Sequence, residues 1–370
     1  MKVMTVFGTR PEGVKMAPII KELEAREGVE QVVCITAQHR EMLDQVTELF
    51  GIVPDYDLNI FKPGQTLTDI TVNSLKGLED VINKEKPDVL LVQGDTTTVF
   101  AGALAAFYQK IKIGHVEAGL RSGNIYSPYP EEANRKLVGV VADFHFAPTE
   151  ANVENLVKEN YSREKIFITG NTVIDALKYA VKDDYKFEDE RLNSLDFENR
   201  KVVLLTSHRR ENLGQPMENV FTAVRDVLKE VPDAVVVFPV HLNPKVREIA
   251  EKAFGRNPSV YLTEPMDYEP FTNLMSRSYL AVTDSGGLQE EAPALGKPVL
   301  VIREETERPE GIEAGTALLV GTSYEAVKEN LYQLLTDEKA YREMAHAVNP
   351  YGDGTASKKI VDILMKSFDK

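Results

Sequence analysis

Short runs of β-branched and apolar residues alternate with amphipathic stretches along the whole chain, and this alternation limits the fold more than any other feature. Parallel strands need a crossover connection between them, and that crossover is usually a helix. Runs that are apolar throughout indicate strands covered on both faces. The sequence therefore predicts an α/β architecture of parallel sheets flanked by helices.

The chain repeats this plan in two halves. Its 370 residues exceed what one hydrophobic core usually covers. Strands are predicted at 3–7, 31–37, 89–93, 113–117, 144–147 and 166–169, and again at 202–206, 234–239, 260–262, 280–283, 299–302 and 317–320. Residues 183–200 are charged and aperiodic, which is typical of a linker. We predict two Rossmann-like domains facing across a cleft, at 1–182 and 200–354, with a helix at about 355–370 that can pack back on the first.

The composition excludes several classes of partner. A net charge of −15 disfavours an extended nucleic-acid or membrane surface, because such surfaces gather Lys and Arg. No apolar stretch approaches the ~18 residues of a membrane span, and the run before Gly8 is too short for a signal peptide. The only cysteine, Cys34, lies in a strand pattern. We expect a cytoplasmic protein in which Cys34 is a buried apolar residue and no intramolecular disulfide forms.

Polar residues directly after the predicted strands are the candidates for function, because open parallel sheets bind ligands beyond the carboxyl ends of their strands. The first strand runs into Gly8-Thr9-Arg10-Pro11-Glu12, where Gly8 permits a tight turn and Pro11 suits the first turn of a helix. Arg10 and Lys15 can both face an anion there. The alternative is a turn with two solvated cations. The loop lacks the GxGxxG pattern, so no nicotinamide or flavin cofactor is indicated.

The strand at 280–283 runs into Asp284-Ser285-Gly286-Gly287 and then into a helix pattern. Two glycines at a helix start allow backbone N–H groups to approach a phosphate, and the helix dipole favours its charge. Glu291 can accept hydrogen bonds from ribose hydroxyls, and Arg308 can add a phosphate or ribose contact. Helix capping explains Ser285 and the acids as well, so the pattern leaves a diphosphate site and a simple cap both open.

Three carboxylates follow strands or begin helices in the first half. Asp95 and Glu117 come directly after apolar strands, where an unpaired charge would be costly, so each needs a partner or a ligand. Glu131 begins a predicted helix. Arg121 and Arg135 are nearby cations that can tune the pKa values of these acids. Each acid can also serve as a helix cap, but three around one crevice favour chemistry.

His208 follows the first strand of the second domain, where it can bind a diphosphate oxygen or transfer a proton. The remaining histidines show no HxH, HExxH or HxxxH spacing with one another: His39, His115, His145, His241 and His346. The sequence therefore predicts no metal site and no cofactor.

Taken together, these motifs resemble the non-hydrolysing UDP-N-acetylglucosamine 2-epimerase family. The resemblance runs from residue 3 to Asn349-Pro350-Tyr351-Gly352-Asp353-Gly354 and rests on six motifs in order. They are Gly8-Thr9-Arg10-Pro11-Glu12, Gln93-Gly94-Asp95-Thr96, His115-Val116-Glu117-Ala118-Gly119-Leu120-Arg121, Pro130-Glu131-Glu132-Ala133-Asn134-Arg135, His208-Arg209-Arg210-Glu211-Asn212 and Asp284-Ser285-Gly286-Gly287-Leu288-Gln289-Glu290-Glu291.

The resemblance implies a glycosyltransferase-B-like fold, a homodimer, and conversion of UDP-N-acetylglucosamine to UDP-N-acetylmannosamine for bacterial surface polysaccharides. It also implies the roles of individual residues. The catalytic group would be Asp95, Glu117, Glu131 and His208. Substrate contacts would come from Arg10, Lys15, Asp95, Glu117, Arg135, His208, Met266, Phe271, Ser285, Gly286, Gly287, Glu291 and Arg308.

The resemblance further implies a second, regulatory UDP-N-acetylglucosamine molecule. Its site would be formed by Gln38, His39, Glu131, Arg209 and His241. This chain departs from the pattern of some family members at Glu41 and Gly64, where they present Gln and Arg. Loss of those donors weakens the expected site.

The chemistry of the substrate favours elimination over simple racemisation. C2 of the sugar has no adjacent carbonyl, so loss of its proton gives no stabilised enolate. Expulsion of UDP from C1 as the C2 proton leaves, through a 2-acetamidoglucal, avoids this problem. A retaining glycosyltransferase is the alternative enzyme, and a nucleotide-sugar binding protein is the non-enzymatic one. The three carboxylates argue against the latter, because diphosphate binding calls for cations.

Overall fold

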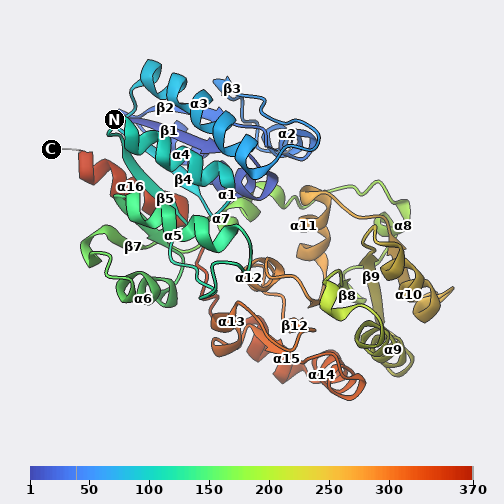
Figure 1. The fold of residues 1–370 in the computed structure, drawn as a ribbon. Coiled ribbons are helices and arrows are strands. Elements are labelled where there is room, and N and C mark those ends of the chain that lie inside the picture. Colours follow the sequence, from blue (N-terminus) through green and yellow to red (C-terminus); the bar gives the residue numbers. More distant parts are fainter. Residues whose placement is uncertain (39, 369–370) are drawn as a thin grey trace. The chain divides into compact units, whose positions relative to one another are not determined.

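The computed structural model describes residues 1–38 and 40–368 (Figure 1). The chain divides into two compact units. Unit 1 comprises Met1–Tyr179 together with the residues from Tyr351 onward, and unit 2 comprises Ala180–Pro350. Each unit contains one parallel sheet, which confirms the predicted α/β class.

The sheet of unit 1 has seven strands in the order β3-β2-β1-β4-β5-β6-β7. They are β1 Lys2–Phe7, β2 Glu30–Ile35, β3 Tyr56–Asp57, β4 Val89–Gln93, β5 Lys112–Val116, β6 Phe144–Ala147 and β7 Ile166–Ile168. The helices are α1 Arg10–Glu24, α2 Arg40–Leu49, α3 Leu67–Glu85, α4 Thr97–Tyr108, α5 Glu131–Val141, α6 Glu150–Lys158, α7 Thr172–Ala180 and α16 Ala356–Phe368. The edge strand β3 was not predicted, because two residues show no periodicity.

Helices cover both faces of this sheet. Helices α3, α4 and α5 pack against one another in sequence, whereas α1 packs against α2 and α16. The apolar residues of β4 are fully buried, as expected for a strand covered on both sides. Cys34 in β2 is also buried, and burial, with the nearby charges of Asp57 and Asp55, raises the pKa of its thiol to about 12. It is therefore the inert, buried thiol that the sequence predicted.

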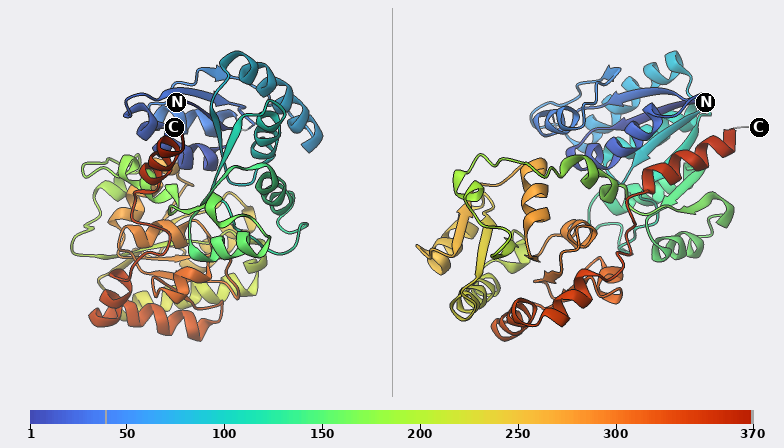
Figure 2. Two further views of the ribbon diagram at one scale, coloured as in Figure 1. Left: turned by 90° about the vertical axis from the view of Figure 1, so that its left-hand side faces the viewer. Right: turned by 180° about the vertical axis from the view of Figure 1, so that it is seen from behind.

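The last helix, α16, belongs to unit 1 and is coloured red in both views of Figure 2. Its N-terminus lies on Asp175 of α7, whose buried carboxylate accepts hydrogen bonds from the backbone N–H groups of Ala356 (3.2 Å) and Ser357 (2.9 Å). The Ser357 hydroxyl donates to the same carboxylate at 2.5 Å. Farther along, Asp362 pairs with Arg26, just after the end of α1, at 2.7 Å. One carboxylate therefore satisfies three donors at the start of this helix.

The sheet of unit 2 has six strands in the order β10-β9-β8-β11-β12-β13 (Figure 1). They are β8 Lys201–Thr206, β9 Ala234–Pro239, β10 Val260–Thr263, β11 Leu280–Thr283, β12 Val299–Val301 and β13 Ala317–Leu319. The helices are α8 Glu190–Asn193, α9 Gln215–Glu230, α10 Pro244–Phe254, α11 Tyr268–Arg277, α12 Leu288–Ala294, α13 Pro309–Glu313, α14 Tyr324–Thr336 and α15 Glu338–Ala345. None of the described helices of either unit is long and apolar enough to cross a membrane.

Residues 183–200 differ from the open linker that their composition suggested. Phe187, Leu192 and Leu195 are buried in unit 2. The Arg277 guanidinium lies over the Phe187 ring, 5.4 Å from its centroid, and donates to the carbonyl of Tyr185 at 3.0 Å. Three apolar side chains and one arginine thus attach the segment to unit 2, although its charged majority hides this in the sequence.

In both sheets the strand order reverses at one pair of neighbouring strands, so that the chain builds outward from this pair in two directions. In unit 1 the pair is β1 and β4, and in unit 2 it is β8 and β11. At such a switch point the loops after the two strands diverge to opposite faces and leave a crevice where ligands bind. The fold therefore directs attention to the loops that begin at Gly8 and Gly94 in unit 1, and at Ser207 and Asp284 in unit 2.

Candidate functional site

Asp95 lies at the switch point of unit 1, in the loop after β4. Its carboxylate pairs with Arg135 of α5 at 2.5 Å, and the Asn134 side chain donates to its backbone carbonyl at 2.8 Å. The preceding residue, Gly94, has φ +80°, a conformation that favours glycine. The first turns of α5 thus hold both the side chain and the backbone of Asp95, and of the two cations expected near the acids, Arg135 is in contact with Asp95.

Glu117 lies at the end of β5 with φ +64°, in the left-handed region that is uncommon for a residue other than glycine. Lys15 pairs with its carboxylate at 2.6 Å, Gln93 donates to it, and Asn171 donates at 3.4 Å. Lys15, predicted to contact UDP, therefore lies against a predicted catalytic acid. Sequence reasoning missed the other two donors, although Gln93 is the last residue of β4 and Asn171 follows β7. Unusual backbone conformations cluster at functional sites.

Glu131 and Glu132 both begin α5, but they differ in environment. Glu131 is half-buried, whereas the side chain of Glu132 is fully buried. Glu132 accepts from the backbone N–H groups of Ser122 (3.0 Å) and Gly123 (3.2 Å) and pairs with Arg135 at 3.0 Å. Glu132 therefore holds this loop in place, whereas Glu131 has no part in these contacts. The sequence alone could not distinguish the two adjacent glutamates.

Arg121 does not tune these acids by direct pairing, contrary to the sequence-based expectation. Its guanidinium donates two hydrogen bonds to Glu159, both 2.9 Å long. This pairing lowers the pKa of the Glu159 carboxyl. Arg121 lies near the site in sequence but is engaged by the end of α6.

His115 supports the loop that holds Asp95. The ring is buried, and its Nε2 lies 2.7 Å from the carbonyl oxygen of Gly94. Burial lowers the pKa of His115 to about 4, so the ring is neutral at physiological pH. The carbonyl acceptor assigns the proton to Nε2, because a neutral imidazole donates from only one nitrogen.

Glu12, in the first turn of α1, is a buried carboxylate that joins two loops. It accepts from the hydroxyls of Thr9 (2.6 Å) and Thr96 (2.9 Å) and from the backbone N–H of Gly8 (3.3 Å). Burial raises the pKa of Glu12 from 4.5 to about 7, although these hydrogen bonds lower it in part. Gly8 itself has no room for a side chain, since an added Cβ would lie 2.1 Å from the Thr36 hydroxyl.

This raised pKa predicts a pH-dependent stability difference between wild type and Glu12→Gln. The folded state binds the Glu12 proton more tightly than the unfolded state, so the free energy of unfolding falls as pH rises from about 4.5 to 7. The loss amounts to about 3 kcal/mol. Glutamine does not titrate. Calorimetry from pH 5 to pH 8 should therefore show the melting temperature of the variant rising relative to wild type by several degrees. A constant difference across that range would contradict the prediction.

The residues predicted for a regulatory ligand in unit 1 are only partly described. The Gln38 side-chain oxygen accepts from the Thr98 hydroxyl at 3.0 Å. His39 lies outside the described residues. Glu41 is exposed on α2, and Gly64 has φ +74° with open space around it. The structure thus places Gln38 beside α4.

In unit 2 the buried carboxylate at the switch point is Asp284. It accepts from the backbone N–H groups of His208 and Arg209, both at 2.9 Å, and from the Asn212 side chain at 3.1 Å. The His208 Nδ1 lies 3.0 Å from its other oxygen. Burial raises the pKa of Asp284. The hydrogen bonds lower it, the one from the His208 side chain most strongly, and their combined effect holds the pKa below its usual value. Asp284 therefore orients His208, a role that the sequence analysis did not assign.

The remaining predicted residues of unit 2 surround the same loop. Gly286 is buried, and an added Cβ would lie 3.0 Å from a carboxylate oxygen of Glu307. Arg308 pairs with the buried Glu290. Ser285 and Gly287 flank Gly286, and Glu291 is buried on α12. Met266 lies just before α11 and Phe271 lies in its first turn, and both residues are half-buried.

Arg209 and His241 lie close to His208. The rings of His208 and His241 are stacked with centroids 5.9 Å apart. The Arg209 guanidinium donates to Glu307 at 3.1 Å. Unit 2 therefore gathers two histidines and an arginine at the ends of β8 and β9.

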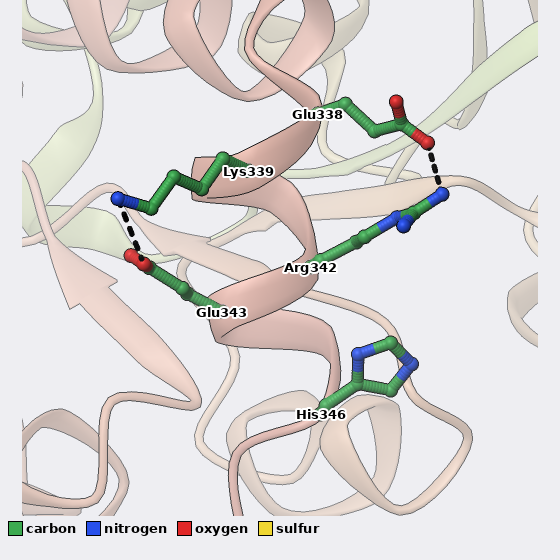
Figure 3. A pocket seen from close by; sticks show the side chains of 5 residues that line it. All are labelled: Glu338, Lys339, Arg342, Glu343 and His346. Atoms are coloured by element: carbon green, nitrogen blue, oxygen red, sulfur yellow. Dashed lines mark hydrogen bonds and ion pairs between the residues drawn. The ribbon is translucent and has the colours of Figure 1, made fainter.

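A separate surface hollow of about 440 Å³ lies along α15 (Figure 3). It is lined by Glu338, Lys339, Arg342, Glu343 and His346. Two ion pairs between residues four apart run along the helix here, Glu338 with Arg342 and Lys339 with Glu343 at 3.8 Å (Figure 3). Exposed pairs of this kind contribute little to stability or recognition, and no predicted site residue lies there.

Two Rossmann-like units, with acids and cations at one switch point and a glycine-rich loop beside histidine at the other, define an α/β protein of the glycosyltransferase-B-like class. The family model described as UDP-N-acetylglucosamine 2-epimerase matches residues 21–365. The chain belongs to this UDP-N-acetylglucosamine 2-epimerase family, and it is therefore an isomerase.

Individual relatives agree with the family model. The UDP-N-acetylglucosamine 2-epimerase of Bacillus subtilis is 55% identical over 99% of this chain and 95% of its own length. A solved structure from Listeria monocytogenes has a TM-score of 0.95 at 50% identity, covering 100% of this chain and 96% of its own. The Neisseria meningitidis epimerase, solved with UDP-GlcNAc bound, has a TM-score of 0.85 at 51% identity, with 99% and 100% covered.

Proposed function

We propose that the protein interconverts UDP-N-acetylglucosamine and UDP-N-acetylmannosamine without hydrolysing them, and that it supplies activated N-acetylmannosamine in the cytoplasm for bacterial surface polysaccharides. The family match over nearly the whole chain is the observation that supports this most strongly. The acids at the switch point of unit 1 supply groups that can transfer protons.

The proposed route is elimination and re-addition. The C2 hydrogen leaves as a proton to a carboxylate while the C1–O bond to UDP breaks and its electron pair leaves with UDP. The remaining sugar is a 2-acetamidoglucal. UDP then re-adds at C1 while C2 is protonated from the opposite face, so atoms and charge balance without an oxidant. The route needs one base and one acid, and carboxylates in different environments can have the separated pKa values required.

The proposal divides the work between the units. Asp95, Glu117 and Glu131 act on the sugar, with Lys15 and Arg135 fixing two of these acids. In unit 2, the loop Ser285-Gly286-Gly287 holds the diphosphate with His208, whose Nδ1 bond to Asp284 leaves Nε2 for a phosphate oxygen. The other UDP contacts are assigned to Arg10, Met266, Phe271, Glu291 and Arg308.

The experiment that tests this function is incubation with UDP-N-acetylglucosamine alone in D2O, without added metal or nicotinamide. The product should be UDP-N-acetylmannosamine with deuterium at C2, resolved by chromatography and NMR. Epimerisation that retains the original hydrogen would rule out elimination. Accumulation of UDP and free N-acetylmannosamine would indicate a hydrolase, and turnover only with an added sugar acceptor would indicate a glycosyltransferase.

Gly286→Val is expected to remove UDP binding. A valine side chain at this buried position would meet Glu307 and keep a phosphate away from the backbone N–H groups of the loop. We expect UDP affinity measured by calorimetry to fall by ~100-fold or more, the loss of about 3 kcal/mol. Circular dichroism should show a folded protein. A folded variant that binds UDP like wild type would show that the diphosphate lies elsewhere.

We further propose that a second UDP-N-acetylglucosamine regulates turnover through Gln38, His39, Glu131, Arg209 and His241. Regulation requires that this ligand bind one state of the enzyme better than another. The reverse reaction from UDP-N-acetylmannosamine alone should then lag until a trace of UDP-N-acetylglucosamine is added. Immediate full-rate turnover, unchanged in His241→Ala, would contradict this proposal.

We also propose a homodimer, formed through the outer face of α4 and α5. These neighbouring helices expose Phe107 (53%), Tyr108 (63%), Leu137 (49%) and Val140 (73%). Apolar side chains gathered and exposed on neighbouring helices favour contact with another protein surface, here a second copy of the chain. Light scattering should give twice the chain mass for wild type and one chain mass for Val140→Glu. The control Val157→Glu, on α6 with 45% exposure, should remain dimeric.

A further inference from the structure

The reaction proposed above leaves Glu12 without a role, although this residue at the switch point of unit 1 is only 2% exposed. One of its oxygens accepts from Thr9 and Gly8 at the end of β1. The other accepts from Thr96, in the loop after β4 and 84 residues away in sequence. The next residue after Thr9 is Arg10, and the residue before Thr96 is Asp95.

We propose that Glu12 is a positioning residue that sets the placement of Asp95 relative to Arg10 by joining the two loops that contain them. Each of its two oxygens is bonded to one loop, and each bonded threonine is adjacent in sequence to a predicted site residue. A shift of either threonine therefore moves a site residue by a comparable amount. This inference rests on the proposed function, since it assigns Asp95 to the sugar and Arg10 to UDP.

The details of the contact favour this role over simple helix capping. The Thr96 hydroxyl accepts from the backbone N–H of Val99 at 3.4 Å and donates to Glu12, so its direction is fixed from both sides. A cap for α1 alone would not need to reach the N-cap residue of α4. A fully buried carboxylate is also costly. A carboxylate has two acceptor oxygens, so this one side chain can accept from both loops at once.

The test compares two substitutions at Thr96 that differ in one group. Thr96→Val removes the hydroxyl and keeps the shape, whereas Thr96→Ser keeps the hydroxyl. Because a displacement of about 1 Å can reduce turnover by ~10²-fold, we expect Thr96→Val and Glu12→Gln to lower kcat by about 10- to 100-fold, with KM changed by less than about threefold. Thr96→Ser should stay within about threefold of wild type. Thr71→Val, on α3, is the control expected to keep wild-type kcat.

Two further variants separate the branches of the contact. Thr9→Val should weaken UDP binding more than it lowers kcat, because it disturbs the loop of Arg10. The double variant Glu12→Gln/Thr96→Val should be no slower than the slower single variant, because both substitutions remove the same hydrogen bond between Thr96 and Glu12. If the two residues acted independently, the two reductions in kcat would multiply.

The outcomes distinguish this inference from the proposed function. A wild-type protein that does not epimerise refutes the function. An active wild type with Thr96→Val equal to Thr96→Ser, or multiplicative effects in the double variant, overturns the role of Glu12. If Glu12→Gln does not fold, the Thr96 pair decides.

Discussion

Glu117→Gln is expected to reduce turnover by ~10²-fold or more while UDP affinity stays within about threefold of wild type. Loss of a general acid or base typically costs this much. The substitution keeps the shape but removes the charge that faces Lys15, with which Glu117 pairs at 2.6 Å. Turnover is measured by chromatography of the two UDP-sugars, and affinity by calorimetry with UDP.

The matched control is Glu48→Gln, an exposed glutamate on α2 of the same unit. Its turnover should equal that of wild type. A Glu117→Gln variant with unchanged turnover, or one whose loss lies in UDP affinity, would contradict the division of roles between the two units.

Asp175→Leu is expected to destabilise unit 1 by about 3 kcal/mol or more, because each buried donor left without an acceptor costs about 1–3 kcal/mol. The carboxylate accepts from Ala356, Ser357 and the Ser357 hydroxyl, and leucine would leave these buried donors without an acceptor. The chain has no tryptophan, so denaturant unfolding is followed by circular dichroism.

The control for this variant is Asp362→Leu, which removes a half-exposed ion pair between α16 and Arg26. Such pairs contribute about 1 kcal/mol or less. Equal losses in the two variants would show that the start of α16 has no special part in holding the helix.

The elements of the fold were largely predictable, because buried parallel strands are uniform in sequence. Strands such as β4 and β9 begin and end at the predicted residues. The packed segment 183–200 was missed because three apolar residues among many charged ones give no periodicity. Its attachment depends on Arg277, nearly a hundred residues away, which no local pattern reveals.

The candidate site was predictable as a set of loops but not as a set of contacts. The strand ends marked Asp95, Glu117 and His208 directly. The residues that orient them could not be assigned, namely Gln93 for Glu117 and Asp284 for His208. Each lies in a different motif from the residue that it orients, and the sequence does not show which polar residues of separate motifs come into contact. Lys15 lies on α1 and Glu117 directly follows β5, so their pairing depends on how two elements far apart in the chain are placed against each other.

The return of α16 to unit 1 has a consequence for synthesis of the chain. Unit 2 is continuous from Ala180 to Pro350, whereas unit 1 requires the residues after Tyr351. Domains of a growing chain usually fold in order from the N-terminus. Here the N-terminal unit is the last to be completed, because Asp175 receives its partners Ala356 and Ser357 only after all of unit 2 has been synthesised. A chain that ends just beyond Pro350 would therefore contain all residues of unit 2 but a unit 1 that lacks α16.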